Sequence, residues 1–382
     1  WSNFEALEAV AADWNDIYPG VLINYTRVSD YNNELDGMLS SPDKPDIVAF
    51  GTTSYYKEKE HLATELEDLS DIGLNTSVFR SGVLSSAMYD GRMLALNWGV
   101  LAPGFAVNND LLASLGLEVP TTHEDFIKVC DALKEAGYVP IQGCYIDVYR
   151  YLLMNDRDAH IASESDQNAL YKMFDEAQEG CGSYFDPEFR TMFELRDKGY
   201  FDHALNTGIE DIYDLNILHF FEGNTPFLAT TTETFSGMKK RESKSEAFTT
   251  APFQYSFVSL PVANETPALS ISTLTGLSIV KDAPHREWAE EFFRFLCTET
   301  ELNKMASVKG VPSLTSSAQD DARFASLMEL PNEKVLDSGS YPVITLISVP
   351  FEDTMWRIAT GEYTTLEEAE QGFEDELKNA FH

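Results

Sequence analysis

The stretch PDIVAFG at residues 45–51 points to the fold class. A short apolar run bounded by proline and glycine is typical of a buried strand in a parallel sheet. Upstream, residues 3–18 place apolar side chains at helical spacing and are followed by a Pro-Gly pair, and residues 21–25 alternate as a half-buried strand. This succession of helix and strand predicts an α/β protein.

The same alternation continues downstream. Thr121 and Glu124 form a capping box that predicts a helix reaching Ala136, and Thr365 and Glu368 form another before the last helix. Short apolar runs predict further strands at 138–141, 227–230, 256–260 and 277–280.

Length and charge narrow the function classes. The chain has 382 residues, which predicts two domains, and no apolar stretch approaches the ~18 residues of a membrane span. It carries 63 Asp and Glu against 27 Lys and Arg, a formal net charge of −36. Such a surface repels phosphates, so we expect no nucleic-acid partner.

No signature of catalysis is present: the sequence contains no G-x-S-x-G, H-E-x-x-H, G-x-x-x-x-G-K or G-x-G-x-x-G motif. We therefore predict no catalytic residues, no metal site and no cofactor. The four cysteines, Cys130, Cys144, Cys181 and Cys297, lie far apart. Cys130 and Cys144 are expected to be buried thiols, although a Cys144–Cys181 bridge would be compatible with an exported protein.

Aromatic residues make up 12% of the chain, and several flank breaks in the secondary-structure pattern. Flat aromatic faces stack on sugar rings, while neighbouring carboxylates and amides bind hydroxyl groups. For a single aromatic residue, core packing is the commoner role. For Trp98 and Trp356 we favour ligand contact.

Several segments resemble, in order over more than 300 residues, those of family 1 extracellular solute-binding proteins. The most specific is 104–122, GFAVNNDLLASLGLEVPTT, which is similar to the family's "G-yNkdlfeklGl-vPkT" signature. Residues 45–48, 89–96 and 220–227 resemble its other segments. Two features depart from the family pattern: the first strand is missing or cut, and residues 310–313 match only loosely.

The resemblance implies a two-lobed periplasmic-binding-protein-like fold (type II), with a ligand cleft between lobes joined by hinge strands. The N-terminal lobe would comprise 1–107 plus 270–315, and the C-terminal lobe 108–269 plus 316–382. The crossings would fall near Pro103-Gly104-Phe105, near 261–272 and after Pro312. Mapped by segment, the ligand-binding residues would be Tyr31, Phe50, Thr52, Trp98, Tyr145, Asp147, Glu233, Phe235, Thr273, Thr275 and Trp356.

The resemblance also implies a carbohydrate ligand, an oligosaccharide in particular, delivered to the membrane permease of an ABC transporter. We expect a monomer outside the cytoplasm, tethered as a cell-surface lipoprotein, with its signal peptide and anchor removed from this chain. A polyamine is the main alternative ligand, since acidic and aromatic residues together would suit it. Ferric ion, a peptide and a glycoside-active hydrolase are further alternatives.

Overall fold

The computed structural model describes residues 4–26, 28, 31–51, 60–80, 87–209, 213–315 and 321–381. Backbone proximity divides the chain into two discontinuous compact units. Unit 1 is Trp1–Leu101 with Ser272–Asp321, and unit 2 is Ala102–Ile271 with Ala322–His382. The chain thus crosses between the units three times. The crossings lie at 101–102, 271–272 and 321–322.

The elements of unit 1 alternate between helices and strands. They are α1 (Phe4–Ile17), α2 (Tyr31–Leu39), β1 (Ile47–Gly51), β2 (Met88–Tyr89), β3 (Arg92–Met93), β4 (Leu96–Leu101), most of β9 (Leu269–Ile279), α14 (Arg286–Leu296) and α15 (Glu299–Lys309).

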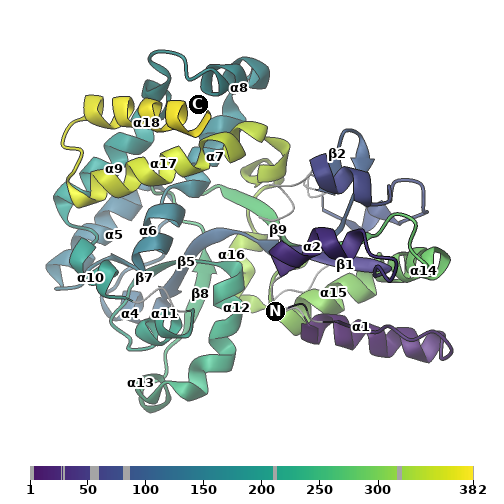
Figure 1. Ribbon diagram of the computed structural model, residues 1–382. Coiled ribbons are helices and arrows are strands. Elements are labelled where there is room, and N and C mark those ends of the chain that lie inside the picture. The colour runs from purple at the N-terminus through teal and green to yellow at the C-terminus, as the bar shows by residue number, and fades with distance from the viewer. Residues whose placement is uncertain are drawn as a thin grey trace. The chain divides into compact units, whose positions relative to one another are not determined.

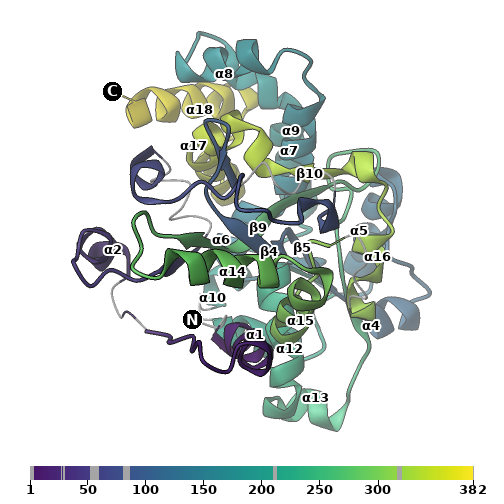
Figure 2. The same cartoon turned by 90° about the vertical axis from the view of Figure 1, so that its right-hand side faces the viewer.

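Strand β9 is the centre of the sheet in unit 1. Both β1 and β4 pair with it antiparallel, and β4 lies beside β9 in Figure 2. The prediction of a strand at 45–51 is confirmed, but its parallel pairing is wrong. A strand contributed from more than 200 residues further along the chain runs against it, and no local pattern encodes that direction.

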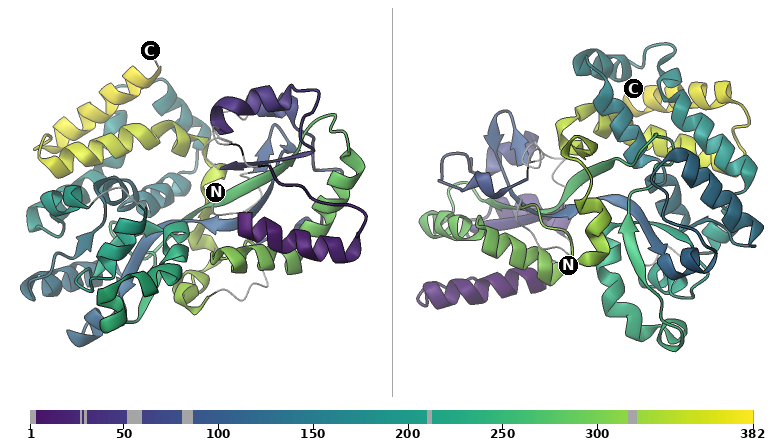
Figure 3. Two further views of the ribbon diagram at one scale, coloured as in Figure 1. Left: turned by 60° about the horizontal axis from the view of Figure 1, so that its bottom comes forward. Right: turned by 180° about the vertical axis from the view of Figure 1, so that it is seen from behind.

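The N-terminal helix packs on α15 and α14, as Figure 3 shows. Trp14 is fully buried there, edge-on to Phe292 at 5.3 Å between ring centroids. The predicted strand at 21–25 is not formed. Instead, the Trp14 indole N–H donates to the Val21 carbonyl at 2.9 Å, and the Tyr25 hydroxyl donates to the Leu7 carbonyl, so side chains hold this segment along α1.

The larger unit 2 is mainly helical around a four-stranded sheet. Its strands are β5 (Pro103–Asn108), β6 (Ile141–Gln142), β7 (Phe227–Thr231) and β8 (Tyr255–Val258), with β10 (Val335–Asp337) beside the start of β9. Its helices are α4 (Asn109–Ser114), α5 (His123–Glu135), α6 (Tyr145–Tyr151), α7 (Met154–Ser163), α8 (Gln167–Asp175), α9 (Asp186–Lys198), α10 (His203–Gly208), α11 (Tyr213–Phe220), α12 (Thr232–Arg241), α13 (Glu246–Thr250), α16 (Ala325–Met328), α17 (Pro342–Thr360) and α18 (Leu366–Phe381).

The strand order in the sheet of unit 2 is β6-β7-β5-β8, with only β6 and β7 parallel. Helices α17 and α18 pack against each other and against α9 (Figure 1). Gly104 on β5 was predicted to permit a chain crossing, but packing explains it: a Cβ atom there would lie 2.6 Å from the Val258 carbonyl oxygen of β8.

Helix capping follows the sequence with one shift. Thr365 and Glu368 form the predicted capping box of α18, whereas α5 is capped by Thr122, whose hydroxyl accepts from the Asp125 N–H, and not by Thr121. No helix within the described residues combines the length and apolar content that crossing a membrane requires.

Candidate functional site

In unit 1, strand pairing brings several predicted site positions together. Trp98 on β4 is opposite Thr275 on β9, and Thr275 is also opposite Gly51 at the end of β1. Thr273 lies two residues along β9. The described structure includes only the backbone of Phe50, Thr273 and Thr275, and Thr52 lies outside the described residues.

Trp98 is the notable side chain of this group. It is 1% exposed, and its indole N–H has no hydrogen-bond partner among the described residues. Gly99, directly after it, has φ 70°, a left-handed conformation inside a strand that glycine adopts readily. The register passes from Trp98–Thr275 to Val100–Thr273 across this glycine. A distorted strand and an unsatisfied buried donor at one place call for an explanation.

In unit 2, predicted residues follow two parallel strands. Tyr145 and Asp147 lie on α6 after β6, and Glu233 lies on α12 directly after β7. Because the carboxyl ends of parallel strands share one edge of the sheet, these segments lie at the same edge, where α/β proteins bind ligands. The Asp147 carboxylate accepts a hydrogen bond of 3.0 Å from the Asn216 side chain. The side chain of Tyr145 is outside the described structure.

Trp356, on α17, is half-buried beside α6 and α10. Its ring is edge-on to Tyr149 at 5.3 Å and to His203 at 5.1 Å between centroids. The Tyr149 hydroxyl and the His203 Nδ1 atom lie 2.8 Å apart. Tyr149 and His203 were not among the site residues predicted from the sequence. The four-residue spacing of Tyr145 and Tyr149 on one helix face was the available signal for the former.

Two predicted residues lie in other surroundings than the sequence suggested. Phe235 is fully buried in unit 2, with Phe257, Phe324 and Tyr255 around it and the Arg323 guanidinium over its ring at 5.2 Å. It is a core residue, because α12 turns this position inward. Tyr31 is the first residue of α2 and does not follow a strand; its side chain is not described.

The described residues hold no group of three or more His, Cys, Asp or Glu placed to bind a metal ion. All four cysteines are buried thiols, and Cys144 and Cys181 form no bridge. Burial and the neighbouring Glu188 raise the pKa of Asp156 to about 7. Both carboxyl groups are only 2% exposed, so they cannot meet a substrate as a hydrolytic pair would.

Comparison with known families gives the class of the protein. Residues 1–301 match the family described as "Bacterial extracellular solute-binding protein". The match covers most of the chain, and the chain belongs to this family. It is a family of binding proteins, which places the protein outside the cytoplasm. No curated protein sequence matches the chain.

Solved structures agree on the fold. Apo RafE from Streptococcus pneumoniae is 16% identical, with a TM-score of 0.76 over 99% of this chain and 94% of that one. RafE in complex with raffinose is 17% identical, with a TM-score of 0.71 over 100% of this chain and 96% of that one. A Bacillus licheniformis sugar transporter in complex with stachyose is 16% identical, with a TM-score of 0.66 over 98% of this chain and 96% of that one. These likenesses establish the two-lobed periplasmic-binding-protein fold.

Proposed function

We propose that this protein captures a carbohydrate, in particular an oligosaccharide, and delivers it to the permease of an ABC importer by closing its two lobes around the sugar. Membership of the family supports capture of a solute. The choice of sugar rests on similar structures with raffinose and stachyose and on the aromatic residues at the predicted site.

The observation that carries the proposal is the buried indole N–H of Trp98, which lies on β4 opposite Thr275 of β9 and has no hydrogen-bond partner among the described residues. A buried donor without a partner costs about 1–3 kcal/mol. A hydroxyl of a bound sugar would satisfy this donor. In unit 2, the Asp147 carboxylate would accept hydrogen bonds from other hydroxyls, and the half-buried ring of Trp356 would offer an apolar surface.

We further propose that the protein acts as a monomer and is tethered to the membrane as a lipoprotein, which would keep a receptor close to its permease. The protein would not transform its ligand, and residues outside the sugar site would meet the permease only transiently.

A thermal-shift screen tests this function. Oligosaccharides, monosaccharides, polyamines, amino acids and ferric ion are each added to the purified protein, because a ligand that binds only the folded state raises the melting temperature. We expect one class of oligosaccharide to raise it, with no product after prolonged incubation. A response to spermidine alone would replace the sugar by a polyamine, and product formation would reveal an enzyme.

A further inference from the structure

The first turn of α7 carries an unusual run of buried polar residues. Asn155, Asp156, Arg157 and Asp158 are all at most 5% exposed. Buried polar groups are costly unless they are hydrogen-bonded, so the partners of these side chains indicate what the turn does.

Two partners of Asn155 lie on the strands that connect the units, and the third, Ser259, directly follows β8. Its amide Nδ2 donates to the Pro103 carbonyl at 3.1 Å and to the Ser259 hydroxyl at 3.1 Å. Its Oδ1 accepts from the Ser270 N–H at 2.8 Å. Pro103 is the second residue after the crossing at 101–102, and Ser270 is the second before the crossing at 271–272.

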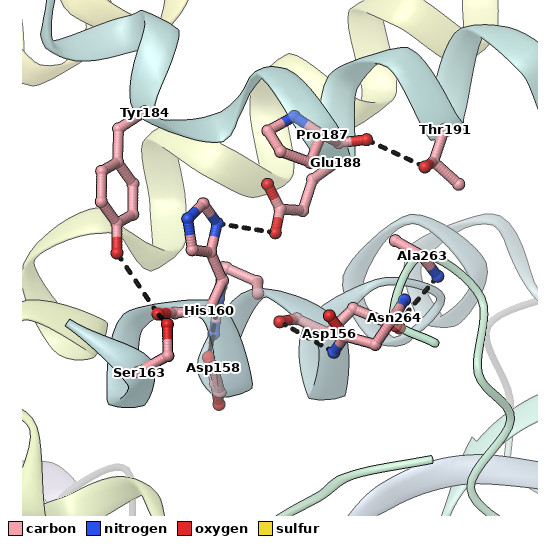
Figure 4. A network of polar contacts seen from close by, with 11 residues as sticks. Asp156, Asp158, His160, Ser163, Tyr184, Pro187, Glu188, Thr191, Ala263 and Asn264 are labelled. Atoms are coloured by element: carbon pink, nitrogen blue, oxygen red, sulfur yellow. Dashed lines mark hydrogen bonds and ion pairs between the residues drawn. The ribbon is translucent and has the colours of Figure 1, made fainter. Parts of the chain in front are cut away.

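The other residues of the turn hold the same region. One oxygen of Asp156 accepts from the backbone N–H groups of Ala263 and Asn264, in the segment between β8 and β9, as Figure 4 shows. The Ser270 hydroxyl donates to Asp158, whose other oxygen is paired with Arg157. One helical turn therefore fixes both connecting strands and the segment that leads into the second of them.

The crossing peptides are also fixed on either side. In unit 2, Ala102 and Thr232 exchange two hydrogen bonds, of 3.1 and 2.9 Å. In unit 1, the Val100 N–H donates to the Pro312 carbonyl at 2.8 Å, and Leu101 pairs with Ser272. On each side of these two crossings, the strands are thus hydrogen-bonded within their own unit.

We propose that the polar turn Asn155–Asp158 anchors the unit 2 ends of the connecting strands, so that Asn155 and Asp158 are positioning residues for the motion between the units. The role of this anchor in ligand capture rests on the proposed function. Loss of the anchor makes the connection between the units more mobile in the ligand-free protein. Closure around a ligand must then order this connection, which costs binding free energy.

The test measures the distance between spin labels at Thr300→Cys in unit 1 and Glu179→Cys in unit 2, both exposed, by pulsed electron spin resonance without ligand. The native cysteines are buried. Asn155→Ala removes the anchor. Asn108→Ala is the matched control: Asn108 is equally buried and caps α4 at the far end of β5. Ser270→Ala removes only the contact with Asp158 and serves where Asn155→Ala does not fold.

We expect Asn155→Ala, or Ser270→Ala to a smaller degree, to broaden the distance distribution while Asn108→Ala keeps the wild-type width. A wild-type width in a folded anchor variant, or equal broadening in the control, overturns the proposal. Because no ligand is used, this result is independent of the sugar assignment. With a sugar identified by the screen, the anchor variant should bind about fivefold more weakly.

Discussion

The carboxyl group of Asp156 offers a quantitative test of how the network around α7 is built. Burial is the main cause that raises its pKa from 3.8 to about 7, and Glu188 on α9 raises it further. Backbone hydrogen bonds from Ala263 and Asn264 oppose the rise, but burial prevails. The second Asp156 oxygen has no hydrogen-bond partner among the described residues, which is consistent with a protonated carboxyl.

The sign of the pH dependence follows from linkage. Between pH 3.8 and about 7 the folded protein holds a proton on Asp156 that the unfolded chain has released. Stability therefore falls as pH rises through this window and levels off above it. The full difference corresponds to roughly 4 kcal/mol, of which about 2–3 kcal/mol falls between pH 5 and pH 8.

Asp156→Asn isolates this contribution, because an amide oxygen can accept the same two backbone hydrogen bonds without carrying a charge. Urea unfolding at pH 5, 6, 7 and 8 should show the variant gaining about 2–3 kcal/mol on the wild type as pH rises. Asp175→Asn, which removes a carboxylate from an exposed position of α8, is the control for net charge. A difference between Asp156→Asn and wild type that is constant with pH, or that shrinks as pH rises, would refute the reasoning.

Three other outcomes follow from contacts described above. Trp98→Phe removes the indole N–H and keeps an aromatic ring. The free energy of unfolding in urea should therefore change by less than about 1.5 kcal/mol, while sugar binding, measured by calorimetry, should weaken about tenfold. Gly104→Ala should destabilise by about 1–3 kcal/mol in the same unfolding assay, because its Cβ meets a β8 carbonyl, whereas Gly37→Ala on α2, with open space around it, should not. A thiol reagent should label none of the four buried cysteines in the native protein and all four in urea; rapid native labelling would contradict their burial.

Local patterns predicted what depends on local chemistry. The apolar spacing of residues 4–17 and the Pro-Gly pair after them defined α1, and Thr365 with Glu368 defined the start of α18. The direction of β1 was not predictable in this way, because its partner in β9 lies more than 200 residues away. Family resemblance supplied the fold that no single segment could.

The surroundings of the candidate site residues depend on contacts between distant segments. Trp98 and Thr275 are next to each other because β4 and β9 pair. Only the family resemblance suggested that these two segments come together. The burial of Phe235 was not predictable, because a loop-like position after a strand does not reveal that Phe324, 89 residues further on, packs on it. No signal in the sequence indicated that the polar run 155–158 is buried, and only its partners on the connecting strands explain that burial.

The most direct test of the central claim is calorimetric titration of the unmodified protein with the oligosaccharide found by the screen, with spermidine as the competing ligand class. We expect saturable one-to-one binding of the sugar and no heat of binding with spermidine. Saturable binding of spermidine with no heat of binding from the oligosaccharide would contradict the carbohydrate assignment and leave the binding-protein fold in place.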